Sequence, residues 1–207
     1  MVYKVENIQS ELYDDKLLCT AYNNMSTNRQ QRADRYKHIE DKRLCVFSDM
    51  LLRQMLNESG VQSPEFCKAQ NGKPILRNSN IHFNLSHTKG HIACVIDHSP
   101  VGIDIEIYRK ISAKLVKRIC TQEELGFVYA CSQSTEDTET IKRFFMVWTA
   151  KEAYLKYTGE GLSGGLQQIS VATEKGMKDK LTEKAYLISV AESNYALSLV
   201  TENPKNK

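Results

Sequence analysis

The sequence contains no apolar run that approaches the roughly 18 residues that a membrane-spanning helix requires. Residues 1–6 lack the apolar core of a secretory signal peptide. The six cysteines are scattered and form no C-x-x-C pair, which argues against a zinc site or a disulfide framework. The net charge of +3 is too small to indicate nucleic-acid binding. These absences predict a cytoplasmic protein with reduced thiols that binds neither membrane nor nucleic acid.

The composition is that of a soluble globular protein, with 41% hydrophobic and 26% charged residues in a chain of 207. This length allows one large domain or two small ones. Hydrophobic periodicity predicts long helices over 40–59, ended by Gly60, and over 141–157. Shorter helices are expected at 29–37, 111–119 and after Thr121. Strands are expected at 1–8, 81–86, 91–97, 101–107, 168–173, 185–191 and 194–200. The three strands between 81 and 107 are expected to form a meander, so both halves follow an α+β pattern.

One predicted strand, residues 101–107, alternates apolar residues with Asp104 and Glu106. Alternate residues of a strand share a face, so the two carboxylates project together, about 6–7 Å apart at Cα. Carboxylates this close repel each other, and a hard divalent cation relieves the repulsion. The alternative interpretation is a solvated face of an edge strand.

The long helix over 141–157 carries a glutamate in its apolar stripe. On a helical wheel, Glu152 falls among the apolar residues Ile141, Phe145, Trp148 and Leu155. An ionised carboxylate there is costly unless it is paired or bound to a metal ion. One interpretation pairs Glu152 with Lys156 at i,i+4. The other makes Glu152 a third metal ligand with Asp104 and Glu106, and lets Lys151 and Lys156 contact phosphates.

Five sequence blocks between about residues 29 and 165 resemble the Sfp-type 4′-phosphopantetheinyl transferases and occur in the order expected for that family. The pairing of G-I-D-I-E with W-x-x-K-E-x-x-x-K about 40 residues later is specific. The blocks are Gly72-Lys73-Pro74, Phe83-Asn84-Leu85-Ser86-His87, Val101-Gly102-Ile103-Asp104-Ile105-Glu106, residues 148–156 and residues 159–163.

The resemblance implies transfer of 4′-phosphopantetheine from coenzyme A to a serine of an acyl or peptidyl carrier protein, with release of adenosine 3′,5′-bisphosphate. It also implies a monomer with two similar α+β halves in a pseudo-twofold arrangement and coenzyme A bound between them. We expect residues 1–100 to form the half on the adenine and 3′-phosphate side. Residues 101–207 would form the half with the metal-binding carboxylates and the catalytic helix.

The family's functional residues map onto single positions of this chain. The implied Mg²⁺ ligands are Asp104, Glu106 and Glu152. Lys73 and Pro74 would lie by the adenine, Ser86 and His87 by the phosphates, and Arg43 by the 3′-phosphate, whereas Lys151 and Lys156 would contact the phosphates. Catalysis is expected from Asp104, Glu152 and Lys156, with Lys156 stabilising the leaving group and Glu152 either binding metal or acting as general base.

Several alternatives remain open from the residues alone. Ser86 and His87 are adjacent in a strand and point to opposite faces, so they do not form a hydrolase nucleophile and base. Glu124 completes a capping box with Thr121 and is also a candidate accessory acid or base. Two other functions compete with transfer: a Mg²⁺-dependent nucleotide pyrophosphatase and a non-catalytic module that binds nucleotide or protein.

Overall fold

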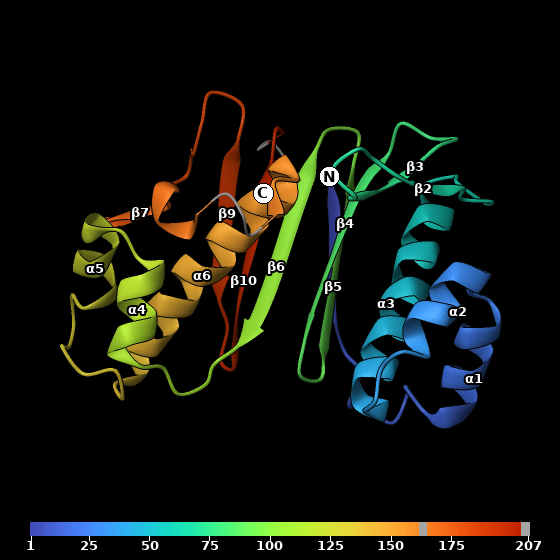
Figure 1. The fold of residues 1–207 in the computed structure, drawn as a ribbon, viewed down its shortest axis with the longest axis horizontal. Helices are drawn as coiled ribbons and strands as arrows, with labels where there is room; N and C mark the ends of the chain where they lie inside the picture. The colour runs from blue at the N-terminus through green and yellow to red at the C-terminus, as the bar shows by residue number, and fades with distance from the viewer. Residues whose placement is uncertain (162–164, 204–207) are drawn as a thin grey trace.

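The first half of the chain folds as an antiparallel sheet with helices on one side. The computed structural model describes residues 1–161 and 165–203 (Figure 1). Its first sheet has the strand order β1-β5-β4. The strands are β1 Val2–Asn7, β4 His82–Thr88 and β5 His91–Asp97. The helices of this half are α1 Asp15–Asn23, α2 Thr27–Ala33 and α3 Ile39–Glu58, and a small hairpin joins β2 Phe66–Lys68 to β3 Pro74–Leu76.

The second half repeats this plan with a sheet of order β6-β10-β9. The strands are β6 Val101–Ile107, β9 Tyr186–Ala191 and β10 Tyr195–Thr201. The other elements are α4 Ala113–Ile119, α5 Gln122–Val128, α6 Thr138–Thr158, the 3₁₀ helix η2 Leu166–Gln168, β7 Ala172–Thr173 and β8 Gly176–Met177. The α+β prediction is therefore confirmed. Within the described residues, no helix is long and apolar enough to cross a membrane.

Several local predictions differ from the structure. The predicted meander is wrong, because β6 pairs with β10 and leaves β4 and β5 in the other sheet. Helix α1, which Asp14 caps by accepting a hydrogen bond from the Leu17 amide, was not predicted. The helix expected over 29–37 begins at Thr27 and ends at Ala33. The segment 168–173 contains only the two strand residues of β7, and α6 begins at Thr138, three residues before the expected start at 141.

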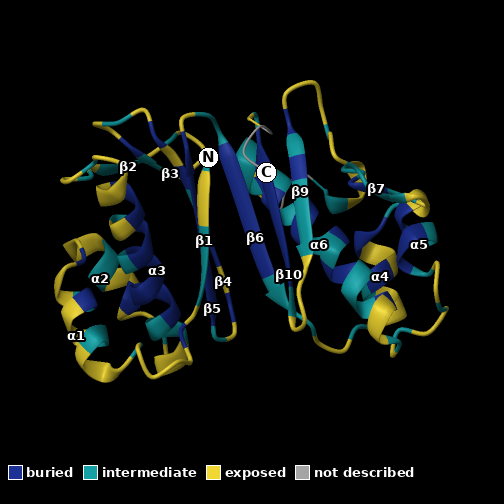
Figure 2. Ribbon diagram, turned by 180° about the vertical axis from the view of Figure 1, so that it is seen from behind, coloured by how far each residue is buried: buried dark blue, intermediate teal, exposed yellow. Residues whose placement is uncertain are grey.

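Three apolar clusters hold the molecule together. One lies between the first sheet and its helices and includes Phe47 and Leu52 of α3. A second surrounds α6 and includes Phe144 and Val147. The third lies between the two sheets, and Figure 2 shows the strands that form it as buried. Its members are Ala93, Val95, Val101, Ile103, Ile105, Leu197 and Leu199. This third cluster joins the two halves into one body.

A glycine in β6 lets the long helix α6 approach the second sheet closely. A Cβ atom on Gly102 would lie 2.0 Å from the Ala153 carbonyl oxygen and 2.5 Å from the Tyr157 amide nitrogen. Backbone cannot yield as a flexible side chain can, so only glycine fits here. The contact brings the helix that carries Glu152 and Lys156 beside the strand that carries Asp104 and Glu106.

Candidate functional site

The site lies at a seam where β4 and β6 run side by side (Figure 1). These strands belong to different sheets, and polar side chains of β4 bond to backbone amides of β6. Asn84 Oδ1 accepts from the Ile103 amide at 3.0 Å. The Ser86 and Thr88 hydroxyls each accept from the next alternate amides, those of Ile105 and Ile107, at 3.4 Å. Alternation along both strands keeps these side chains on one face.

Asp104 is the most buried carboxylate of the seam, with an exposed fraction of 6%. Its Oδ1 accepts from the Ser86 hydroxyl at 2.7 Å and from the Lys156 ammonium at 2.6 Å. Its Oδ2 is buried and has no hydrogen-bond partner among the described residues. Burial raises the pKa of Asp104, although Lys156 and Ser86 oppose this rise. A buried carboxylate oxygen without a partner is unusual and makes Asp104 a candidate functional group.

Glu106 lies two residues along the same face and is less buried. Its Oε2 accepts from Arg109 at 2.7 Å and from the Thr88 hydroxyl at 3.1 Å. Thr88 and Arg109 were not predicted as site residues. The alternation of Asn84, Ser86 and Thr88 in the sequence was the signal that pointed to a polar face of β4.

Glu152 is half-buried on α6 and lies close enough to Asp104 and Glu106 to interact with their charges. Burial is the largest cause that raises the pKa of Glu152, and the negative charges of Asp104 and Glu106 raise it further. The predicted i,i+4 pair with Lys156 is not formed, because the Lys156 ammonium turns to Asp104. The three predicted carboxylates therefore influence one another across the seam.

A divalent cation would relieve two electrostatic features of this cluster, but the three predicted carboxylates do not form a three-ligand metal site in the described part of the chain. Among the described residues, no three His, Cys, Asp or Glu side chains are gathered closely enough to hold a metal ion. Lys156 and Arg109 instead balance the charges of Asp104 and Glu106. The unpartnered oxygen of Asp104 and the mutual repulsion of the carboxylates are both features that a hard cation relieves.

The structure corrects the expectation that Lys151 contacts phosphates. Its ammonium is completely buried, 2.6 Å from Glu124 Oε2, and donates to the carbonyl oxygens of Ile119 and Leu166. The Glu124 carboxylate also accepts from the Thr121 amide, which completes the predicted capping box. Both charged groups are fully buried, so Glu124 serves as a capping and pairing residue in this structure.

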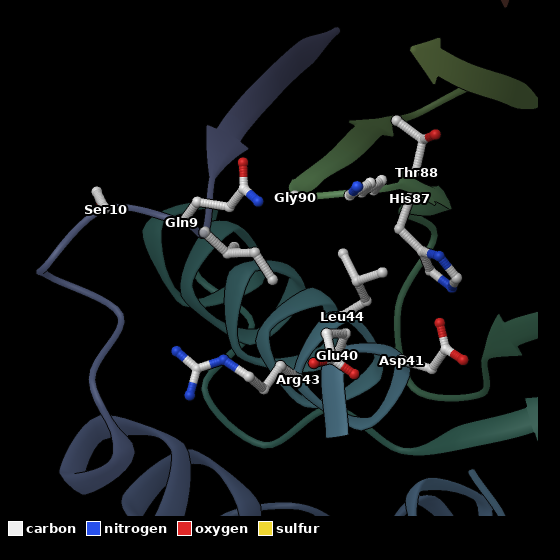
Figure 3. A pocket seen from close by; sticks show the side chains of 11 residues that line it. Gln9, Ser10, Glu40, Asp41, Arg43, Leu44, His87, Thr88 and Gly90 are labelled. Atoms are coloured by element: carbon white, nitrogen blue, oxygen red, sulfur yellow. The ribbon is translucent and has the colours of Figure 1, made fainter. Parts of the chain in front are cut away.

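A pocket of about 460 Å³ opens beside the seam, where the N-terminal end of α3 meets the turn between β4 and β5 (Figure 3). His87 and Thr88 line one side of it, and Asp41 lies near the His87 ring. Desolvation by the surrounding protein lowers the pKa of His87, and the positive charge of Lys156 lowers it further. Thr88 connects this pocket to Glu106 through its hydroxyl.

Arg43 also lines this pocket but points away from His87 (Figure 3). Its guanidinium pairs with Asp15 at 2.8 Å and donates to the Tyr13 carbonyl oxygen. Asp15 is almost fully exposed, so this ion pair is one that an anionic ligand can exchange at small cost. The structure therefore brings Ser86 to Asp104, and it places His87 in the pocket with Arg43 at the pocket's edge.

Lys73 and Pro74 lie at the other end of the seam, in the β2–β3 hairpin, and line a small cavity of about 120 Å³. The Lys73 ammonium donates to the Val101 carbonyl oxygen at 3.1 Å and to the carbonyl oxygens of Lys156 and Tyr157. Gly159 ends α6 with a φ of 77°, as a helix cap that favours glycine. Residues 162 and 163 of the last family block lie outside the described residues.

Comparison with known proteins identifies the family. Residues 100–200 match the model of the 4′-phosphopantetheinyl transferase superfamily. The chain is 33% identical over 150 residues to the 4′-phosphopantetheinyl transferase psf-1 of Bacillus pumilus, covering 70% of this chain and 63% of the relative. It is 34% identical over 143 residues to the transferase gsp of Aneurinibacillus migulanus (67% and 58%). It is also 34% identical over 158 residues to the transferase HetI of Nostoc sp. (72% and 65%).

The matched segments span less than two thirds of the length of these curated relatives. The family model covers β6 and α6, which supply every carboxylate of the seam. On these grounds, the chain belongs to the 4′-phosphopantetheinyl transferase superfamily.

Proposed function

We propose that this protein transfers the 4′-phosphopantetheine group of coenzyme A to a serine of an apo acyl or peptidyl carrier protein. One observation carries the proposal. The Lys156 ammonium lies between Ser86 and Asp104, next to a buried carboxylate oxygen that lacks a partner. This arrangement offers a cation to a phosphate and oxygen ligands to a metal ion on the same face of the seam.

The proposed reaction is a displacement at the phosphorus atom that carries the pantetheine group. The serine oxygen forms a bond to this phosphorus, the bond to the bridging oxygen breaks, and adenosine 3′,5′-bisphosphate leaves with that oxygen. Glu152 takes the serine proton, because its raised pKa makes it a better base than an ordinary glutamate. Lys156 donates to the departing oxygen and stabilises its charge.

Asp104 and Glu106 are the residues that would hold Mg²⁺, with Glu152 as the base beside them. The ion would neutralise the negative charge of the diphosphate and so favour attack by a neutral hydroxyl. Ser86 and Thr88 orient the carboxylates of Asp104 and Glu106 through the hydrogen bonds described above. This second layer of contacts fixes the direction of the ligand oxygens before any ion binds.

Coenzyme A is proposed to bind along the seam, between the two halves. His87 and Arg43 would take its 3′-phosphate and diphosphate, and Lys73 and Pro74 would lie by its adenine. The pocket beside His87 supports this placement, because Thr88 links it to the carboxylate cluster.

We also propose that residues 1–100 and 101–207 are two equivalent halves related by a pseudo-twofold axis. Each half has its own three-stranded antiparallel sheet, a long helix and an apolar cluster of its own, which supports this division. A cytoplasmic location, a monomeric state and the use of Mg²⁺ over other divalent ions stay predictions.

Mass spectrometry of an apo carrier protein tests the activity. Incubation with coenzyme A, Mg²⁺ and this protein is expected to add one phosphopantetheine, about 340 Da, to a single serine. The same incubation with Glu152→Gln serves as the control. Release of adenosine 3′,5′-bisphosphate without labelling of the carrier would contradict transfer and favour hydrolysis of the diphosphate.

A further inference from the structure

We propose that the Lys73 side chain is a positioning residue that crosses the seam and fixes the C-terminal end of helix α6. This role goes beyond the adenine contact expected of its hairpin, and its effect on the reaction rate rests on the proposed function. Lys73 belongs to the first half of the chain, yet the hydrogen bonds of its ammonium within residues 1–161 and 165–203 all go to second-half carbonyl oxygens, those of Val101, Lys156 and Tyr157.

Two of these carbonyls belong to the last turn of α6, which ends at Thr158. The last four carbonyls of a helix have no partner within the helix, and a cation is favoured there by the helix dipole. The third carbonyl belongs to Val101, the first residue of β6. One ammonium therefore holds the helix that carries Lys156 to the strand that carries Asp104.

The consequence for Lys156 is direct. Its backbone oxygen is held by Lys73, while its side-chain ammonium reaches Ser86 at 2.9 Å and Asp104 at 2.6 Å. Glu152 lies one helical turn earlier on the same helix. Fraying of the last turn would move Lys156 first and would then loosen the position of Glu152.

The hairpin turn that carries Lys73 is itself built to dock on α6. Gly72 has a φ of 82°, and the Lys73 amide donates to the Asn71 side chain at 3.1 Å. The Asn71 amide group lies so close to the helix cap that a Cβ atom on Gly159 would be 2.1 Å from its nitrogen. Two successive contacts, by Asn71 and Lys73, therefore join this turn to the end of α6.

The surroundings of the Lys73 ammonium support a permanent structural contact. Burial lowers the pKa of Lys73 to about 8, and the positive charge of Lys73 contributes to the lowered pKa of His82 on the same half. An ammonium that donates to three carbonyl oxygens and is shielded from water is not available to bind a ligand. The adenine contact of this hairpin would then involve the backbone or Pro74.

Hydrogen exchange of the ligand-free protein tests the proposal without reference to activity. In Lys73→Met, which keeps the length of the side chain, the amides of Tyr157, Thr158 and Gly159 are expected to exchange roughly tenfold faster than in the unaltered protein. Lys68→Met is the matched control, because Lys68 is exposed on the same hairpin. Equal exchange in Lys73→Met and Lys68→Met would overturn the proposal.

Kinetics then separates positioning from ligand contact. Lys73→Met is expected to lower kcat for carrier labelling roughly tenfold or more and to change the calorimetric Kd for coenzyme A less than about threefold. A weaker Kd with an unchanged kcat would assign Lys73 to the ligand and overturn the proposal. If Lys73→Met does not fold, Lys73→Gln, which keeps a donor without the charge, is measured for the same exchange and Kd. Absence of activity in the unaltered protein would refute the proposed function, whereas the exchange result would still decide the role of Lys73.

Discussion

The Lys156 ammonium nitrogen lies 2.6 Å from Asp104 Oδ1, and the two residues are 52 positions apart in the chain. The contact joins helix α6 to strand β6 at the seam between the two sheets. It satisfies one oxygen of Asp104, whereas the other is buried and has no hydrogen-bond partner in the part of the chain that the structure describes. Four predictions follow from this and from the neighbouring contacts.

Replacement of Glu152 by glutamine should remove activity and stabilise the ligand-free fold at neutral pH. Loss of a general base typically costs about 10²–10⁴-fold in rate. Because the folded-state pKa of Glu152 is raised, the unaltered protein loses stability as the pH rises through the interval between the ordinary and the raised value. Glu152→Gln mimics the protonated form, so its Tm advantage should be larger at pH 7.5 than at pH 4. An unchanged kcat would contradict the catalytic assignment.

Magnesium ions should stabilise the protein in the absence of coenzyme A. A ligand at 100 times its Kd adds about 2.7 kcal/mol to the free energy of unfolding. For a chain of this size the Tm should rise by about 5–10 °C. Glu106→Gln, which removes one proposed ligand at the more exposed end of the cluster, should show a much smaller rise. Equal rises in both proteins would place the ion elsewhere.

Replacement of Lys151 by methionine should destabilise the fold strongly. The Glu124 carboxylate would then remain buried without its cation, which typically costs about 3–5 kcal/mol. The double variant Lys151→Met/Glu124→Gln should recover part of this loss, since glutamine keeps the capping contact without the charge. Urea unfolding of the two single variants and the double variant measures the coupling. Additive effects would mean that the two charges do not depend on each other.

Replacement of Gly102 by alanine should displace α6 from β6. The new methyl group would meet backbone atoms of Ala153 and Tyr157, and overpacking of this kind costs about 1–3 kcal/mol or more. The rate of carrier labelling should fall by more than the loss of folded protein explains, because α6 carries Glu152 and Lys156. Gly126→Ala is the matched control, since only the flexible Glu174 side chain is near and alanine favours the helix there. Equal losses of activity and stability in Gly102→Ala and Gly126→Ala would contradict the conclusion that the close approach of α6 requires glycine at position 102.

Much of the site was predictable because its residues lie close together in regular elements. Strand alternation placed Asp104 and Glu106 on one face of β6, and the Thr121 and Glu124 pattern identified the start of α5. Neither prediction requires knowledge of distant contacts. The pairing of β6 with β10 does require such knowledge, because it joins segments about 90 residues apart. No local sequence pattern distinguishes this pairing from a meander in which β6 pairs with β5.

The charges of α6 show a second limit of sequence analysis. A helical wheel locates one apolar stripe, and it placed Glu152 in that stripe. Helix α6 is covered on two sides, by β6 and β10 and by the segment that contains α4 and α5, so it has two buried faces. Lys151 lies on the second face and is fully buried, whereas Glu152 is half-buried. The helical wheel gives the direction of each side chain around the helix. It does not show which of these directions face other parts of the chain.

The hydroxyls of Ser86 and Thr88 each contact an amide of β6 and a carboxylate, Asp104 or Glu106. Docking of the two sheets and assembly of the site are therefore the same event. Neither half contains a finished site on its own, and a slip of one residue along β4 would exchange these hydroxyls for Leu85 and His87. Separation of the two sheets would therefore inactivate the protein even if each sheet stayed folded.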